Sequence, residues 1–164
     1  MSKLPEYSQL KTSEKFRARL LQIMDDSERN TAKEFAGFVG VSTPVIAKAK
    51  NYGIVPSLKM LIKIADKLEL SFLYLLGESD SNDFIPSANP SSFYKRLPQI
   101  AEERGENYGH IASRMPFPRT YIYEWLKENT LPSPEYLLAL AEYFNVSPDY
   151  LLGRTDYRNW KCYN

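Results

Sequence analysis

A repeated pattern is the feature that most constrains the fold of this chain. Residues 56–80 align without a gap with residues 132–156, and ten of the 25 aligned positions are identical. The longest identical run, Tyr-Leu-Leu-Gly, occupies residues 74–77 and again residues 150–153. Nearly the same offset continues upstream through these pairs: Phe16/Phe93, Arg19/Arg96, Leu20/Leu97, Ile23/Ile100, Ala36/Ala112 and Ile46/Ile122. The self-match predicts two copies of one structural unit in tandem.

Each copy is predicted to contain five short helices. Apolar residues recur at helical spacing, as in Phe16, Leu20 and Ile23, and a polar capping residue precedes most of these runs. Gly77 and Gly153 follow the last helix of each copy, where glycine is the usual residue. The helices are expected to follow or begin at Ser13, Thr31, Thr43, Ser57 and Ser71, and in the second copy to follow Ser92, Asn107, Pro118, Ser133 and Ser147. The sequence therefore predicts an all-α fold.

The expected domains are residues 1–80 and 92–164, joined by a polar, turn-rich linker at residues 81–91. Pro98 falls inside the first helix of the second copy, where a proline is expected to kink the helix or cost about 3 kcal/mol. Both copies are expected to bury the same core, formed by Leu20, Phe35, Ile46, Leu61 and Ile64 and by Leu97, Ile111, Ile122, Leu137 and Leu140.

The arrangement of these residues resembles the phage-repressor (Xre/Cro-like) helix-turn-helix family. The resemblance rests on Thr31, Phe35-Ala36, Val39-Gly40-Val41-Ser42 and Ile46, followed by Pro-Ser and by Ser-x-x-Tyr-Leu-Leu-Gly. It covers about 65 residues in each half. It implies two tandem five-helix repressor-like domains, each with its third helix in the DNA major groove. The implied function is sequence-specific binding of double-stranded DNA by a transcription regulator, with repression favoured.

The resemblance also implies which side chains meet DNA. Ile46 and Ile122 hold the inner face of the third helix, so the opposite face reads base edges. The second helix begins with backbone N–H groups that can bind phosphate. The implied contact residues of the first copy are Thr31, Ala32, Thr43, Pro44, Lys48, Lys50 and Asn51. Those of the second copy are Tyr108, Arg119, Thr120, Tyr121, Glu124 and Lys127. Tyr121 and Tyr123 flank Ile122 and are expected to touch either the DNA backbone or a partner protein.

The second copy departs from the family pattern in its turn. Pro116 stands where the first copy has Gly40, and proline cannot adopt the positive φ that such a glycine often takes. The direction of the helix after this turn is therefore expected to differ from that of the corresponding helix in the first copy. Arg119 is expected to begin that helix, where its charge opposes the macrodipole unless an anion lies nearby.

Composition excludes several classes of function. No apolar run approaches the roughly 18 residues of a membrane span, and the first residues lack the apolar stretch of a secretory signal. Cys162 is the sole cysteine and His110 the sole histidine, so an internal disulfide is impossible and a catalytic or metal site is not expected. We expect a cytoplasmic non-enzyme without a cofactor, with His110 as a surface residue. The net charge of +1 requires any DNA binding to depend on local basic groups.

Two readings of the function remain open at this point. The alternative to a DNA-binding regulator is a protein-interaction module, such as an antitoxin or an adaptor that binds another regulator, with a diverged second domain. A neutral, aromatic face on the third helix of both copies would favour this alternative. For a DNA reader, the different residues of the two copies predict an asymmetric operator. Some fourteen residues separate Gly77 from Ser92, and at roughly 3.3 Å each they would span more than 40 Å.

Overall fold

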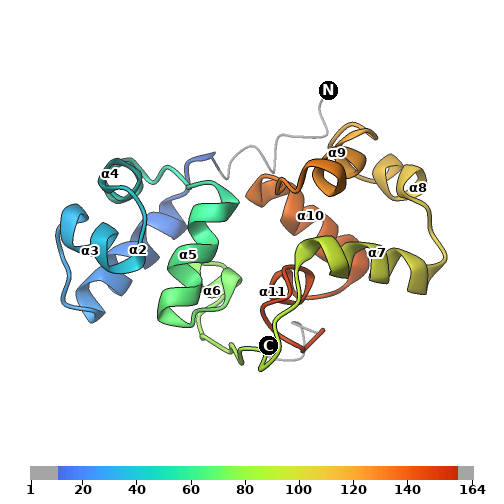
Figure 1. Ribbon diagram of the computed structural model, residues 1–164. Coiled ribbons are helices and arrows are strands. Elements are labelled where there is room, and N and C mark those ends of the chain that lie inside the picture. Colours follow the sequence, from blue (N-terminus) through green and yellow to red (C-terminus); the bar gives the residue numbers. More distant parts are fainter. Residues whose placement is uncertain (1–10, 159–164) are drawn as a thin grey trace. The chain divides into compact units, whose positions relative to one another are not determined.

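The computed structural model describes residues 11–158, and within this range the regular structure is helical apart from one isolated β-bridge between Thr12 and Ile54. The all-α class predicted from the sequence is confirmed. The chain divides between Phe84 and Ile85 into two compact parts, which we call the first unit and the second unit. Helices α2–α6 belong to the first unit and α7–α11 to the second (Figure 1). Cys162 lies outside the described residues.

The first unit is built from five helices with polar N-caps. Its helices are α2 (Glu14–Asp26), α3 (Ala32–Val39), α4 (Thr43–Tyr52), α5 (Leu58–Leu68) and α6 (Phe72–Leu75). The hydroxyls of four N-cap residues accept a hydrogen bond from a backbone N–H of the first turn: Ser13, Thr31, Ser57 and Ser71. These bonds satisfy donors that a helix start otherwise leaves unpaired.

The second unit has its own set of five helices. They are α7 (Phe93–Arg104), α8 (Tyr108–Ser113), α9 (Tyr121–Glu128), α10 (Pro134–Phe144) and α11 (Pro148–Leu151). Ser92, Asn107 and Ser147 cap α7, α8 and α11 through their side chains. Ser133 occupies the N-cap of α10, but its buried hydroxyl has no hydrogen-bond partner among the described residues.

The expected core side chains are buried in both units. All ten residues predicted as core have no measurable exposure: Leu20, Phe35, Ile46, Leu61, Ile64, Leu97, Ile111, Ile122, Leu137 and Leu140. Phe16 and Phe93, near the start of α2 and α7, are buried with them. This part of the sequence prediction is confirmed.

Pro98 does not end α7, which runs from Phe93 to Arg104 with the proline inside it. The ring removes one backbone donor and opposes the preceding turn. The helix is nevertheless held on both sides of Pro98 by buried apolar side chains, including Leu97 and Ile100. The helix therefore continues through the proline, with buried side chains on both sides of it.

An arginine joins the first and last helices of each unit in the same way; Arg19 is half-buried and Arg96 is buried. In the first unit, the guanidinium of Arg19 lies 3.8 Å from the ring centroid of Tyr74, and Nη1 donates to the backbone oxygens of Tyr74 (2.6 Å) and Ser79 (3.0 Å). In the second unit, Arg96 lies 3.9 Å from the ring centroid of Tyr150. Its Nη1 donates to the backbone oxygens of Tyr150 (2.8 Å) and of the residue five positions later (3.2 Å). The arginine thus fastens the last helix of each unit to the first.

The glycine that ends each Tyr-Leu-Leu-Gly run meets two constraints. Gly77 and Gly153 have φ values of 79° and 78°, a region that residues with a Cβ rarely adopt. A Cβ on Gly77 would lie 2.5 Å from the backbone oxygen of Lys15, and one on Gly153 would collide with the backbone of Ser91. The chain at the start of the first helix therefore packs directly on this glycine in each unit.

Replacing Gly153 with alanine is expected to lower the free energy of unfolding by about 1–3 kcal/mol or more, because strain and a backbone collision add. The matched control is Gly37→Ala, in α3, where nothing lies within 4 Å of the Cβ position. That change should be neutral or stabilise by up to about 1 kcal/mol. Urea unfolding of both variants measures the difference, and equal effects would contradict the close approach at Gly153.

The expected linker, residues 81–91, is hydrogen-bonded at both ends. Near its start, Asn82 accepts from the backbone N–H of Ser71 (2.7 Å) and donates to the backbone oxygen of Glu69 (3.1 Å). Further on, the backbone N–H groups of Ser87 and Ser91 donate to carbonyl oxygens of the segment after α11, at 2.9 and 3.0 Å. Each end of the expected linker is therefore hydrogen-bonded to the unit next to it in the sequence.

Candidate nucleic-acid interface

In the first unit, α3 and α4 meet through a tight turn. Gly40 follows α3 with a φ of 83°, and α4 begins three residues later at Thr43. Ala36 and Ala49 are buried between the helices, and Ile46 holds the inner face of α4 against the core. Small residues at this contact allow the two backbones to approach closely. The opposite face of α4 is consequently turned to solvent.

The residues expected to contact DNA from α4 lie mostly on this exposed face. Thr43, Pro44, Lys48 and Asn51 are exposed, whereas Lys50 is half-buried. The Nζ atom of Lys50 donates to the backbone oxygen of Asn30 at 3.0 Å, next to the start of α3. Lys50 therefore places its charge beside the first turn of α3. There, Thr31 is exposed and Ala32 is half-buried.

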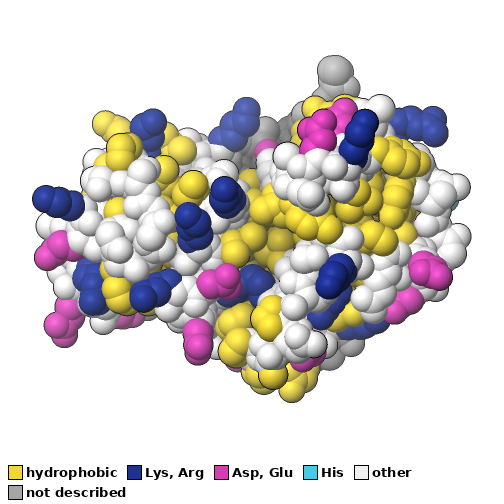
Figure 2. Space-filling view, in the orientation of Figure 1, with side chains coloured by type: hydrophobic (Ala, Val, Ile, Leu, Met, Phe, Trp, Pro, Cys, Tyr) yellow, Lys and Arg dark blue, Asp and Glu magenta, His cyan; other side chains and the backbone are white. Residues whose placement is uncertain are grey.

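The stretch of sequence that contains α4 is basic, although the exposed Glu34 lies in the first turn of α3. From residue 35 to residue 65 the chain contains four lysines and no acidic residue. Lys48 lies on α4, and Lys59 and Lys63 lie exposed on α5. Basic side chains are visible over this part of the first unit in Figure 2. The sequence interpretation missed Lys59 and Lys63, although the acid-free interval is visible in the sequence.

The second unit connects α8 and α9 by a longer turn. Residues 114–120 separate the two helices, and among them none has a positive φ. In place of a left-handed glycine, Phe117 enters the core and its ring packs at 5.0 Å from Trp125 and 5.1 Å from Tyr136 (centroid to centroid). Pro116 thus changes the turn as the sequence indicated. Ring packing, rather than a special backbone conformation, holds this turn.

Arg119 lies in this turn and not at the first position of a helix, which corrects the expectation from the sequence. Helix α9 begins at Tyr121, and the first i to i−4 bond of this helix runs from Glu124 to Thr120. The backbone N–H of Tyr121 instead donates to the oxygen of Pro118 in a tighter turn. The prolines delay the helix, because each fixes φ and lacks a donor.

The side chain of Arg119 reaches back to the start of α8. Its Nη2 lies 3.1 Å from the position that a Cβ on Gly109 would occupy, close to the N-cap Asn107. A guanidinium beside the amino-terminal end of a helix faces like partial charge. An anion bound at this point would relieve that repulsion.

The two tyrosines that flank buried Ile122 have different surroundings. Tyr121 is half-buried and its ring stacks on Phe117 at 6.2 Å. Tyr123 is 52% exposed and its ring meets that of Tyr108 edge-on at 5.4 Å. Of the two tyrosines expected to touch the DNA backbone or a partner, Tyr123 is therefore the more accessible.

The remaining expected residues of the second unit lie on its surface. Thr120, Glu124 and Lys127 are exposed, and Tyr108 is half-buried, with a pKa raised by burial. His110 is also exposed, as expected. In contrast to the first unit, residues 111–141 carry three basic and three acidic residues. The surface around α9 is therefore neutral and aromatic.

A comparison with protein families identifies part of this region. Residues 112–151, from the end of α8 to α11, match the helix-turn-helix family. This segment is therefore similar to helix-turn-helix domains. The family is one of DNA-binding regulators and not of catalysts. No curated protein and no solved structure matched the chain.

No group of His, Cys, Asp and Glu in residues 11–158 has the arrangement needed to hold a metal ion. In the same range, no helix combines the length and apolarity of a membrane span.

A charged cluster fixes the corner between α7 and α8. The carboxylate of Glu106 accepts from Arg104 Nε at 3.0 Å and from the hydroxyl of Tyr143 at 2.7 Å, and His110 Nε2 lies 3.5 Å away. The hydrogen bond from Arg104, followed by that from Tyr143, lowers the pKa of Glu106. The cluster joins the α7–α8 corner to α10.

A lowered pKa in the folded state means that the ionised Glu106 stabilises the fold. This contribution is present above the ordinary pKa of 4.5 and is lost as the pH falls through the lower folded value. Glu106→Gln is therefore expected to flatten the acid side of the pH dependence of unfolding, and Tyr143→Phe to do so partly. Denaturant unfolding at pH 6, 5, 4 and 3 measures the slope, and an unchanged slope in Glu106→Gln would refute the assignment.

Proposed function

We propose that this protein is a sequence-specific double-stranded DNA-binding transcription regulator, a repressor, that reads DNA with α4 and α9. The observation that carries the proposal is the exposed face of α4, which lies in an interval with four lysines and no acidic residue. The helix-turn-helix match at residues 112–151 supports it for α9. A regulator of this kind acts in the cytoplasm.

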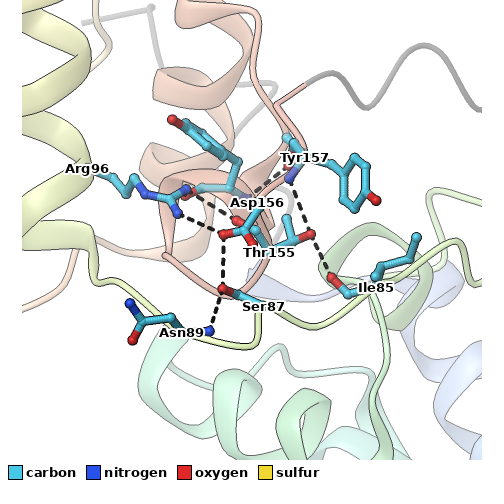
Figure 3. Close-up of polar contacts among 9 residues, drawn as sticks. Ile85, Ser87, Asn89, Arg96, Thr155, Asp156 and Tyr157 are labelled. Carbon is cyan, nitrogen blue, oxygen red and sulfur yellow. Dashed lines mark hydrogen bonds and ion pairs between the residues drawn. The ribbon is translucent and has the colours of Figure 1, made fainter.

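The proposal includes a tandem arrangement, with one helix-turn-helix domain in each unit. Its support is the set of contacts that recurs at the repeat offset. Arg19 and Arg96 make equivalent contacts in the two units. Each one bonds to the backbone oxygen of the tyrosine in its Tyr-Leu-Leu-Gly run and to the backbone oxygen five residues later (Figure 3 shows the contacts of Arg96). Gly77 and Gly153 have the same φ and the same close backbone approach. The proposed domains are residues 1–80 and 92–164.

In the first unit, the exposed side chains of α4 would contact base edges. An α-helix fits the major groove, and a lysine can donate to the acceptors of guanine. Lys48 is placed for this role near the middle of α4, with Thr43 and Pro44 at the helix start. Asn51 lies one turn further on, where it would reach the DNA backbone.

Phosphate binding would be provided at the start of α3 and α8. Lys50 adds a charge beside the first turn of α3, and Lys59 and Lys63 extend the positive surface along α5. In the second unit, Arg119 faces the first turn of α8, where a phosphate would relieve its electrostatic repulsion. Each such contact would release counterions and make binding dependent on salt.

The second unit favours a second candidate role, that of protein binding. Tyr123 is an exposed aromatic residue on α9, and the charges around this helix balance. Aromatic residues are enriched in protein interfaces. The same ring, however, suits apolar contact with the methyl group of thymine, so we assign α9 to DNA and test the alternative directly.

Selection from a random duplex library is expected to return one preferred sequence for the intact chain. Against that duplex, Lys48→Ala should weaken binding by about 1–3 kcal/mol, because a base contact is lost. The matched control is Lys15→Ala on α2, whose Nζ lies 3.6 Å from the carboxylate of Glu78. Fluorescence anisotropy at several salt concentrations measures both. Equal binding by Lys48→Ala and the parent, with an intact fold, would remove Lys48 from the interface.

A pair of tyrosine variants separates a surface role from a packing role. Tyr123→Ala is expected to weaken DNA binding and to change the free energy of unfolding by less than about 0.5 kcal/mol, because the residue is exposed. Tyr121→Ala should lower the free energy of unfolding by about 1–3 kcal/mol through loss of ring packing. If Tyr123→Ala binds the selected duplex as tightly as the parent, α9 does not use this residue for DNA, and protein binding becomes the favoured role of the second unit.

A further inference from the structure

The third helix of each unit carries one position at which the charge is reversed between the two copies. At the repeat offset of 76, residues 43–52 align with residues 119–128. In only one of these ten pairs are both side chains charged, and the two charges are opposite: Lys48 in α4 and Glu124 in α9. At each of the other pairs, at most one of the two residues is charged. The reversal therefore concerns a single equivalent position.

Lys48 and Glu124 face solvent at the same phase of their helices. Each lies two residues after a fully buried isoleucine, Ile46 in α4 and Ile122 in α9. At about 3.6 residues per turn, two residues correspond to a rotation of about 200°, so the side chain leaves the helix on the side opposite the core. Both residues are accordingly exposed. The core of each unit sets this phase for its own helix.

Neither charge is neutralised by a neighbour within residues 11–158. In this range, the side chains of Lys48 and Glu124 have no hydrogen bond and no ion pair with another residue. The carboxylates of Glu103 and Glu106 in the second unit, by contrast, each accept a hydrogen bond from an arginine. The charges of Lys48 and Glu124 are therefore available to a ligand that lies against the exposed face of the helix.

The two side chains require opposite groups on a base edge. An ammonium group only donates hydrogen bonds, and a carboxylate only accepts them. In the major groove, guanine presents the acceptors N7 and O6, whereas cytosine presents the amino donor N4. A carboxylate placed against guanine would face acceptors, and an ammonium group placed against cytosine would face a donor. Each wrong pairing carries a penalty, and penalties of this kind generate specificity.

We propose that Lys48 and Glu124 are specificity-determining residues at the equivalent position of their two helices, where Lys48 selects guanine and Glu124 selects cytosine. This inference rests on the proposed function and adds to it the base that each helix requires. In a G·C pair, the acceptors of guanine and the donor of cytosine lie side by side in the groove, so reversing the charge reverses the preferred orientation of the pair. Each residue acts on one base pair of the DNA that its own helix contacts, whatever the order or spacing of the two contacted segments.

Selection from a random duplex library by the full-length chain and by two charge-reversal variants tests the proposal. Lys48→Glu is expected to change one position of the selected sequence from guanine to cytosine and to leave the other positions as they are. Glu124→Lys is expected to change a different position from cytosine to guanine. Both residues are exposed, so urea unfolding should give free energies close to that of the parent. An unchanged base preference in either variant would overturn the proposal.

Affinities for two duplexes that differ at one base pair give the size of the effect. For the parent, inverting the pair that contacts Glu124 is expected to weaken binding about 5- to 100-fold, the range that a good base contact contributes. Glu124→Lys should reverse this ratio and bind the inverted duplex more tightly. Fluorescence anisotropy at one salt concentration measures both ratios. Equal affinity of the variant for the two duplexes would overturn the base contact.

Two charge controls separate base reading from a general effect of charge. Lys63→Glu on α5 makes the same change of charge as Lys48→Glu, at a proposed phosphate contact, and should weaken binding to all duplexes equally. Glu128→Lys, one turn beyond Glu124 on α9, makes the same change as Glu124→Lys and should leave the preferred bases unchanged. A shift of base preference in either control would show that net charge sets the preference, and would overturn the proposal.

Glu124 also lies in the first turn of α9, where a carboxylate stabilises a helix through the macrodipole. If this is its only role, Glu124→Lys will lower the free energy of unfolding and weaken binding to all duplexes to the same extent, and the proposal fails. A duplex selected by the parent with unchanged preferences in both variants would leave the proposed function standing without the base assignment. If the parent selects no duplex, the proposed function fails and this inference fails with it.

Discussion

Each unit depends on one guanidinium that is stacked on a tyrosine ring and bonded to backbone carbonyls. Arg19 and Arg96 bring the last short helix, α6 or α11, back to the first helix, α2 or α7. A buried guanidinium is tolerated because its donors are paired and its flat faces are in contact with carbon. With the last helix held in place, the other helices pack on a complete hydrophobic core. The side of α4 or α9 that packs on this core determines which side faces solvent.

The two units place a similar helix on that core by different means. In the first unit, a glycine in a left-handed conformation makes the turn before α4 short. In the second, a seven-residue turn is filled by Phe117, whose ring contacts other aromatic rings. The charge differs in parallel, since α4 lies in a basic interval and α9 in a neutral one. The two units therefore join their first and last helices by equivalent contacts, but the surfaces around α4 and α9 differ chemically. Such a difference is expected if the two helices bind different sites.

Much of the fold of each unit was predictable from the sequence, because helices and core positions depend on the periodic spacing of buried residues. The repeat, the helix caps and the ten core residues follow from spacing, and Ile46 and Ile122 correctly identify the inner faces of α4 and α9. Predictions that depended on long-range contacts were less successful. The position of Arg119 depends on two prolines and a buried ring, and the binding of the linker depends on Asn82 and Asp156 meeting groups that lie elsewhere in the sequence. Pairing of polar groups has no period, so pattern analysis does not reveal it.

The turn of the second unit also has a thermodynamic consequence. Stereochemistry at Gly40 sets the turn before α4, and steric limits on φ do not change with temperature or solvent. The turn before α9 is held instead by burial of Phe117 among aromatic rings, and such burial weakens on cooling and in urea. Cooling or mild denaturant is therefore expected to loosen the turn before α9 more than the turn before α4. The two helices themselves are both held by buried isoleucines, Ile46 and Ile122, whose contribution weakens under the same conditions.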